Sequence, residues 1–297
     1  MKDLESNKER DAIQRRALLS RLIFLVPGVT YIVVLMLIPL GFIFVYTFLS
    51  RGTYGGIETV FTLSNYTRAL DPLYLKVLLD SILIATITTL LAFAIGFPVA
   101  YAITKLPAHR QNLMLVLIVL PFWTNFLIRT YAWIVLLNTQ GFLNQGLMKL
   151  GVLSQPISLL YKPSAVVLGL LYAYLPLMIL PIYSALVRID PAMREAAVDL
   201  GASPSEAFRQ VTLPLAIPGV LIGGIFVFVP SLGNFIVPEL LGGGKMIMVG
   251  NLIRDQFLKA RDWPFGSVLA LSMVLMLLLL FFIQARINKR ILGVNHA

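Results

Sequence analysis

Residues 165–187 read AVVLGLLYAYLPLMILPIYSALV, and residues 188–214 continue as RIDPAMREAAVDLGASPSEAFRQVTLP. The first run has no charged side chain and is long enough for a helix to cross the roughly 30 Å hydrocarbon core of a membrane. The second run carries charges of both signs together with residues that start and stop helices. This abrupt change in composition predicts a transmembrane helix that ends in a polar loop at the membrane surface.

The polar loop contains the start and stop signals of two short helices. Asp190 followed by Pro191 is typical of a helix N-cap with proline at the first helical position, and Gly201 is typical of a helix end. Ser203 and Glu206 have the spacing of a capping box, in which each side chain accepts from the backbone N–H of the other residue. The loop is therefore predicted to fold into two short helices outside the lipid.

The first of these short helices offers a flat surface flanked by charge. Glu195 and Asp199 are one helical turn apart, so they lie on the same face. Ala196 and Ala197 beside them are small, and a helix with small side chains can enter a groove on another protein. Pro214 marks the entry into the next apolar run.

Five more apolar runs occur along the chain. Of all residues, 58% are hydrophobic and 13% are charged, whereas about a quarter are charged in a typical soluble domain, so lipid is the expected solvent. We expect an all-α membrane protein with a cytoplasmic leader at residues 1–21, a transmembrane domain at 22–285 and a cytoplasmic tail at 286–297. The six predicted transmembrane helices cover residues 22–49, 81–103, 113–137, 165–187, 215–237 and 267–285.

Lysine and arginine residues set the expected orientation. Six spans place both termini on the same side of the membrane. The segments on that side, which include the loop at residues 188–214, hold 14 Lys and Arg residues, whereas the opposite loops hold nine over a longer stretch. Because basic residues concentrate on the cytoplasmic side, both termini and this loop are predicted to be cytoplasmic.

The residue types that are missing exclude several functions. Cysteine is absent, which excludes disulfides, thiolate metal sites and cysteine nucleophiles. His109 and His296 stand alone without the further ligands of a metal site. Residues 242–245, GGGK, lack the upstream glycine and the following Ser or Thr of an ATP-binding phosphate loop. We expect no enzymatic activity, metal or cofactor on this chain, so energy for an active process must come from another chain.

The net charge of +10 does not predict a nucleic-acid partner. Most of the Lys and Arg residues lie between the apolar runs, and the chain has no basic stripe with interleaved aromatic residues.

The polar loop resembles the EAA loop of permease subunits in binding-protein-dependent ATP-binding-cassette importers. The resemblance rests on EAAVDLGA at residues 195–202 and on Leu213 followed by Pro214. It implies the type I importer fold, in which this loop forms coupling helices that enter a cleft of a partner ATPase. It also implies that Glu195 contacts the ATPase and that Gly201 permits the turn. The residues expected to couple to the ATPase are Glu195, Ala196, Ala197, Asp199, Gly201 and Pro214.

Three further stretches resemble the bacterial spermidine/putrescine permeases, and specifically the first of their two paired permease subunits. They are LPFWTNFLIRTYAW at residues 120–133, FIVPELLGG at 235–243 and DWPF at 262–265, and residues 187–201 at the start of the polar loop share the same resemblance. The resemblance implies a location in the inner membrane and transport of a polyamine delivered by a periplasmic binding protein. It implies a second permease subunit and an ATPase dimer as partners, with ATP and magnesium bound by the ATPase. Permeases for related cations, opines or amino-acid derivatives share such motifs and remain an alternative.

A polyamine pathway needs carboxylates and aromatic faces, because both attract organic cations. Glu239, at the outer end of the fifth predicted span, is the best-placed carboxylate, although plain interfacial solvation explains it equally well. An aromatic belt at the membrane surface is the alternative for the rings. Arg129 is unexpected in a cation pathway and is predicted to reach the surface or to pair with Glu239 or Asp262. The aromatic candidates are Trp123, Tyr131, Trp133, Tyr172 and Tyr174.

A secondary transporter or a channel that acts alone is the second interpretation of an apolar chain with six spans. Ion-coupled transporters of this kind carry acidic or histidine residues within the membrane. The six predicted spans contain no Asp, Glu or His. This composition favours a permease driven by an ATPase.

Overall fold

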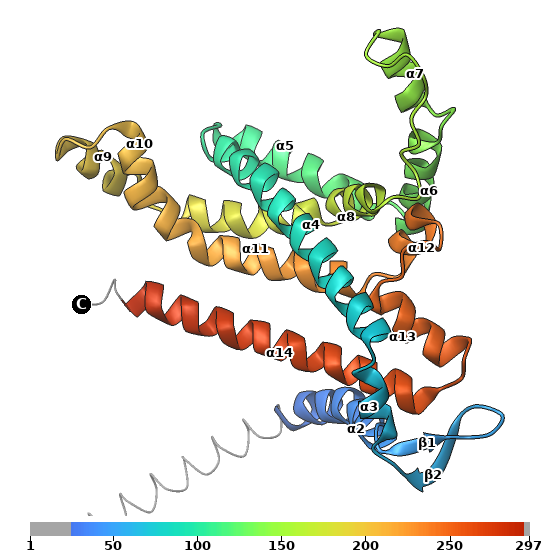
Figure 1. Ribbon diagram of the computed structural model, residues 1–297. Helices are drawn as coiled ribbons and strands as arrows, with labels where there is room; N and C mark the ends of the chain where they lie inside the picture. Colours follow the sequence, from blue (N-terminus) through green and yellow to red (C-terminus); the bar gives the residue numbers. More distant parts are fainter. Residues whose placement is uncertain (1–24, 294–297) are drawn as a thin grey trace, which may run out of the picture.

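The computed structural model describes residues 25–293, with side chains described to residue 288. The described chain is almost entirely helical, with one short antiparallel hairpin (Figure 1). The first half contains a π-helical turn at Val33–Leu37, α2 (Ile38–Tyr46), β1 (Leu49–Arg51), β2 (Ile57–Phe61), α3 (Ser64–Ala69), α4 (Pro72–Thr104), α5 (Ala108–Val119), a 3₁₀ turn at Leu120–Trp123, α6 (Phe126–Leu137) and α7 (Phe142–Lys149). The second half contains α8 (Pro163–Val187), α9 (Pro191–Asp199), α10 (Pro204–Ala207), a π-helical turn at Phe208–Thr212, α11 (Leu213–Gly233), α12 (Ile236–Gly242), α13 (Val249–Leu258) and α14 (Trp263–Gly293).

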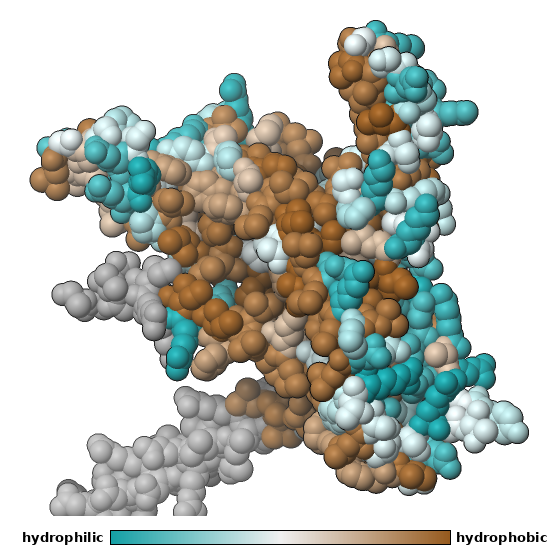
Figure 2. All heavy atoms as spheres, viewed as in Figure 1, coloured by the Kyte–Doolittle hydropathy of each residue, from teal (hydrophilic) through white to brown (hydrophobic). Residues whose placement is uncertain are grey.

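Five of the described helices are long and apolar enough to cross a membrane, and a bent pair of helices can form a sixth crossing. The long helices run between two ends of the molecule (Figure 1). The end with α9 and α10 holds the loop predicted to couple to an ATPase and is named the coupling end for that prediction. The opposite end, with β1, β2, α3, α12 and α13, is called the outer end. Apolar side chains cover the middle of the face seen in Figure 2, and polar side chains gather towards both ends.

Three long helices, α4, α8 and α11, form the centre of the bundle. Glycines allow α8 and α11 to approach closely. A Cβ on Gly219 would lie 2.6 Å from the carbonyl oxygen of Pro181, and a Cβ on Gly223 would lie 3.0 Å from that of Met178. Two small residues separated by one helical turn are a common way to pack membrane helices, because they bring the two backbones together.

The first and last long helices lie outside this centre. The first, Leu25–Tyr46, has no buried side chain and is apolar on all sides, which suits a helix surrounded by lipid. Its described part begins at residue 25, so the predicted start at residue 22 lies outside the described residues. The predicted end is wrong, because Leu49 already belongs to β1.

Two other predicted spans are too short. Helix α4 begins at Pro72 rather than at residue 81, because Asp71 caps it by accepting a hydrogen bond of 2.8 Å from the Leu73 N–H. Helix α14 runs from Trp263 to Gly293 rather than from 267 to 285, so it continues into the predicted tail. Hydropathy alone missed these turns because they carry charged residues beyond the apolar run.

The third predicted span, residues 113–137, is not one straight helix. The chain bends by 90° between the helical segments Ala108–Trp123 and Phe126–Lys149. Pro121 lies in the first part of the short 3₁₀ turn before the bend, and Asn125 caps the new helix with its side-chain oxygen. Proline weakens the helical ladder and asparagine offers an alternative backbone partner, so these residues together end one helix and start another.

The helix observed at the fifth predicted span ends four residues before the predicted end. Its start is continuous with the coupling loop. Helix α11 ends at Gly233, and Val237 belongs to the separate helix α12. At the other end, the helix runs without interruption from Pro204 to Gly233. The second short helix of the loop is therefore the first part of a long helix, and Pro214 lies within it after the π-helical turn.

The outer end is tied together by contacts between distant parts of the chain. Arg68 on α3 donates to Asp262 at 2.6 Å, and Asp262 is 1% exposed. Asp262 also accepts from the Phe265 N–H at 3.2 Å, so it caps the start of α14. Arg51 on β1 donates to the Ala260 carbonyl oxygen at 2.7 Å. The hairpin and α3 are thus fixed to the start of the last helix.

Candidate functional site

The coupling end has the local geometry that the sequence predicts. Asp190 accepts a hydrogen bond of 2.9 Å from the Ala192 N–H and caps α9. Gly201 has a φ of +92°, a conformation that suits glycine because it has no Cβ. Ser203 and Glu206 form the predicted capping box, with the Ser203 N–H donating to the Glu206 carboxylate at 2.7 Å.

The surface of α9 is open. Glu195, Ala196 and Asp199 are exposed, and Ala197 is half-buried. At the end of the helix Leu200 is 89% exposed, which is a large apolar side chain in the polar part of the molecule. Exposed apolar side chains rimmed by charge are typical of protein–protein interfaces. This surface is suited to docking on another protein.

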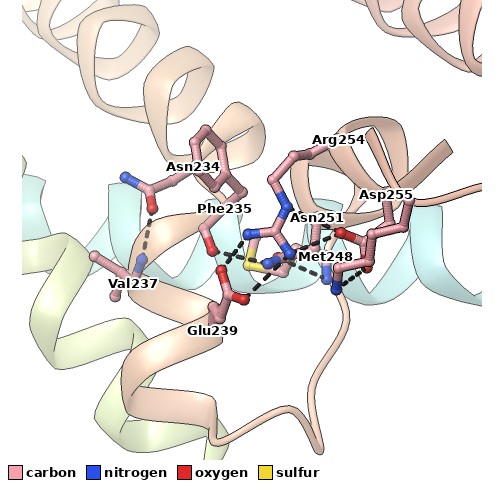
Figure 3. A network of polar contacts seen from close by, with 9 residues as sticks. Asn234, Phe235, Val237, Glu239, Met248, Asn251, Arg254 and Asp255 are labelled. Atoms are coloured by element: carbon pink, nitrogen blue, oxygen red, sulfur yellow. Dashed lines mark hydrogen bonds and ion pairs between the residues drawn. The ribbon is translucent and has the colours of Figure 1, made fainter. Parts of the chain in front are cut away.

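A second polar constellation lies at the outer end, where α11 ends and α12 begins (Figure 3). Asn234 accepts from the Val237 N–H at 2.8 Å and donates through Nδ2 to the Tyr174 hydroxyl at 2.7 Å. Asn251 on α13 donates at 2.7 Å to the carbonyl oxygen of Phe235. The bonds to the Val237 N–H and the Phe235 carbonyl oxygen satisfy backbone groups that the interrupted helix leaves without partners.

Glu239 on α12 is paired with Arg254 on α13. Arg254 also donates to Asp255 at 2.7 Å, and Lys259 donates to the other Asp255 oxygen at 3.0 Å. Partial burial acts to raise the pKa of Asp255, but hydrogen bonds from Arg254 and Lys259 and their charges hold it below the ordinary value for aspartate. The hydrogen bond to Glu239 raises the pKa of Arg254. Arg254 is thus shared between two carboxylates and partly offsets the charge of Glu239.

Arg129 does not pair with either acid that the sequence offered. Asp262 is bound by Arg68, and Glu239 is bound by Arg254. The Arg129 guanidinium lies instead 5.6 Å from the ring centre of Phe122 and 5.7 Å from that of Phe126.

The aromatic candidates fall into three positions. Trp133 and Tyr172 form an edge-to-face pair with ring centres 5.5 Å apart, which joins α6 to α8. Tyr174 binds the helix interruption at Asn234. Trp123 and Tyr131 are 79% and 55% exposed on the bent segment. The structure therefore gathers Tyr174 and Glu239 around one interruption, and it leaves Trp123 and Tyr131 on an open face.

A family model described as the binding-protein-dependent transport system inner membrane component matches residues 13–293. The chain belongs to this family. It is consequently a multi-pass transport subunit of the inner membrane.

Named relatives within this family are similar over most of their length. The chain is 43% identical over 267 residues to the spermidine/putrescine transport system permease protein PotB of Escherichia coli strain K12, which covers 89% of this chain and 97% of the relative. It is 41% identical over 260 residues to PotB of Haemophilus influenzae, covering 88% of this chain and 91% of the relative.

Solved structures show the same fold. A chain in the crystal structure of a bacterial alginate ABC transporter, in complex with a periplasmic protein that holds an alginate pentasaccharide, superposes with a TM-score of 0.75. The match covers 95% of this chain and 97% of that chain at 15% identity. At this low identity the superposition shows the fold alone. That fold is the predicted type I permease architecture.

Sequence reasoning missed the residues that organise the outer end. Asn234, Asn251 and Arg254 hold the interruption between α11 and α12, and Asn125 caps the helix after the bend. The sequence contains one signal for these two helix interruptions. In both places an Asn-Phe pair begins four residues after a proline.

Proposed function

We propose that this chain is the membrane-spanning subunit of an ATP-driven importer that moves putrescine, spermidine or a closely similar organic cation into the cell. The similarity to the PotB permeases, at 41–43% identity over about nine-tenths of the chain, carries this proposal. The apolar parts of the three central helices contain no Asp, Glu or His, which are the residues that couple transport to an ion gradient. This composition is consistent with an energy source outside the chain.

The partner that supplies the energy docks on α9. An ATPase dimer binds ATP and magnesium, and its cleft receives the small, exposed surface around Ala196 with Glu195 at its edge. This assignment places the coupling end in the cytoplasm and the outer end towards the periplasm. A loaded binding protein then delivers its solute at the outer end, and a second permease subunit completes the pathway.

The long helix from Pro204 to Gly233 explains how movement reaches the pathway. Its 30 residues span about 45 Å at the rise of an α-helix. Its first turn lies in the coupling loop and is fixed by the Ser203–Glu206 capping box. A displacement of the docked loop therefore moves the far end of the same helix, at Gly233.

The carboxylate that the arriving solute is expected to meet, Glu239, is already paired with Arg254. Glu239 is 46% exposed and is bound by Arg254, so an arriving ammonium group must compete with the guanidinium. This competition gives weak binding, which suits a pathway that must release its cargo. The exposed rings of Trp123 and Tyr131 offer additional attraction to organic cations.

The test is uptake by the complete transporter in proteoliposomes. We expect ATP-dependent accumulation of labelled putrescine and spermidine, with unlabelled amino acids and opines competing poorly. Replacing Glu195 with alanine is expected to leave the subunit assembled in the membrane and to reduce uptake, because Glu195 is exposed and its loss removes a contact to the ATPase. Glu58→Ala, an exposed glutamate on β2 at the opposite end, is the matched control.

Two results would contradict this function. Failure of the wild-type transporter to accumulate either polyamine would refute the substrate, and accumulation of an opine or amino acid instead would identify the alternative. Normal uptake by Glu195→Ala would refute the docking role of that residue.

A further inference from the structure

The two interruptions of the long helices are copies of one motif. Residues 120–128 read LPFWTNFLI and residues 229–237 read VPSLGNFIV. In both, an aliphatic residue precedes a proline, and Asn-Phe begins four residues after that proline and is followed by two more aliphatic residues. Asn125 and Asn234 thus occupy matching positions, 109 residues apart in the chain.

The matching positions also have the same backbone conformation. Asn125 has φ −59° and ψ 130°, and Asn234 has φ −70° and ψ 128°. The side-chain oxygen of each asparagine accepts from the backbone N–H three residues later, which belongs to Ile128 or Val237. Each motif ends one helix and caps the next, and the two new helices, α6 and α12, pack against each other.

The two copies differ in what holds them. Asn125 is exposed, and the described residues give its side chain no partner beyond the amides of its own helix. Asn234 is half-buried, and its Nδ2 donates to the Tyr174 hydroxyl of α8 at 2.7 Å. One side chain therefore connects three helices at the second copy, because Asn234 follows α11, caps α12 and binds α8.

We propose that the Tyr174–Asn234 hydrogen bond is a latch that sets the angle between α11 and α12, so that displacement of α11 becomes displacement of α12. Tyr174 and Asn234 are positioning residues in this proposal. It rests on the proposed transport function, in which α11 carries movement from the coupling end. The copy at Asn125 lacks such a bond, and its helix α6 packs against α12.

The latch assigns Tyr174 a different role from that of a pathway aromatic. An aromatic face that attracts the cation needs the ring and not the hydroxyl, because phenylalanine also makes cation–π contacts. The latch needs the hydroxyl and not the ring. The substitution Tyr174→Phe removes only the hydroxyl and therefore separates the two roles.

The first experiment measures uptake per ATP hydrolysed in the reconstituted transporter. Tyr174→Phe is expected to lower this ratio by about threefold to tenfold, the range for loss of one hydrogen bond between neutral groups. The KM for the loaded binding protein should stay unchanged, because the outer docking surface is intact. Tyr172→Phe is the matched control, since its hydroxyl lies two residues away on the same helix and its ring packs on Trp133.

Asn234→Ser tests the other partner. Serine is a good N-cap but is too short to reach Tyr174, so the latch is lost while the cap is kept. We expect the same fall in the ratio, and no further fall when Tyr174→Phe is added, because both changes remove the same bond. Asn125→Ser, at the unlatched copy, should leave the ratio within twofold of wild type.

A second measurement does not depend on the solute. The chain has no cysteine, so spin labels can be placed on introduced cysteines at Gln210 and Lys245, which are exposed near the start of the long helix and after the end of α12. The distance between them should stay narrowly distributed through the ATP cycle in the latched protein and broaden in Tyr174→Phe. Equal breadth in both proteins would overturn the latch.

The outcomes separate the two proposals. A wild-type transporter that moves no polyamine refutes the substrate, and the label distances still decide the latch. A Tyr174→Phe variant with a normal uptake ratio, or a Tyr172→Phe variant with an equal defect, overturns the latch even when polyamine transport is confirmed.

Discussion

The coupling end and the outer end are both polar, but they are held together in different ways. At the coupling end the caps join residues that are two or three positions apart, as in Asp190 with Ala192 and Ser203 with Glu206. At the outer end the Ser81 hydroxyl accepts from the Val249 N–H across 168 residues, and Arg68 reaches Asp262 across 194. The coupling end is therefore locally encoded and exposed for a partner, whereas the outer end depends on the assembled bundle.

The largest effect is expected where the outer end has no room for a side chain. A Cβ on Gly250 of α13 would lie 2.8 Å from the backbone carbon of Gly233, and backbone atoms cannot move aside as a flexible side chain can. Gly250→Val should destabilise the subunit by about 3 kcal/mol or more. It should lower the amount of subunit found in the membrane and its unfolding temperature.

Gly146→Val is the control for this change. Gly146 also lies within a helix, α7, and no atom lies within 4 Å of its added Cβ. The control should therefore cost nothing measurable, because valine has a somewhat higher helix propensity than glycine and meets no neighbouring atom. Equal losses in both variants would show that close packing at Gly250 is not the cause.

The next effect concerns the ion pair at the outer end. Arg68→Ala leaves the buried Asp262 carboxylate without its cation, and the cost is expected to be about 2 kcal/mol. This value is below that of a fully buried pair because Arg68 is itself 43% exposed. Thermal unfolding of the purified transporter measures it. Arg51→Ala, which removes a bond to an uncharged carbonyl, should have a smaller effect, and the opposite order would contradict this account.

A smaller effect on stability is expected at the coupling end. No atom lies within 4 Å of a Cβ added to Gly201, so only its φ of +92° resists substitution. Gly201→Val should cost about 1–2 kcal/mol of local strain and misdirect α9, while the bundle stays folded. ATP hydrolysis should then continue with reduced uptake.

Gly201→Asn provides the comparison at the same position. Asparagine adopts positive φ more readily than valine, so it should retain more uptake. Normal uptake by Gly201→Val would show that the shape of this turn is not needed for coupling.

The same difference between the ends decides what could be predicted from the sequence. The capping residues and the turn at Gly201 were predicted residue by residue, because each depends on neighbours within a few positions. The apolar runs gave five of the spans and the fold class. The bend at Asn125 and the early end of α11 at Gly233 were missed, because hydropathy does not register a helix that stops inside an apolar run.

The outer contacts could not be predicted for a different reason. Nothing local indicates that Arg254, rather than Arg129, pairs with Glu239, because that choice depends on how α13 folds back against α12. The roles of Trp123, Tyr131 and the other pathway candidates stay predictions, since they depend on the proposed second permease subunit as well as on this chain.

The smallest effect is expected at Glu239, which we propose as the first carboxylate that the solute reaches at the outer end. Glu239→Gln keeps the shape of the side chain and removes its charge, so arriving cations lose one counter-charge at the mouth of the pathway. Because the carboxylate is exposed and shared with Arg254, an interaction of up to about 1 kcal/mol is at stake, or roughly a fivefold slower uptake. Asp255→Asn is the control, since it removes the other carboxylate bound by Arg254 without changing α12. Both the Glu239→Gln and the Asp255→Asn variant should reach the membrane in normal amounts. If labelled putrescine and spermidine enter at the wild-type rate at every concentration in Glu239→Gln, the carboxylate only holds Arg254.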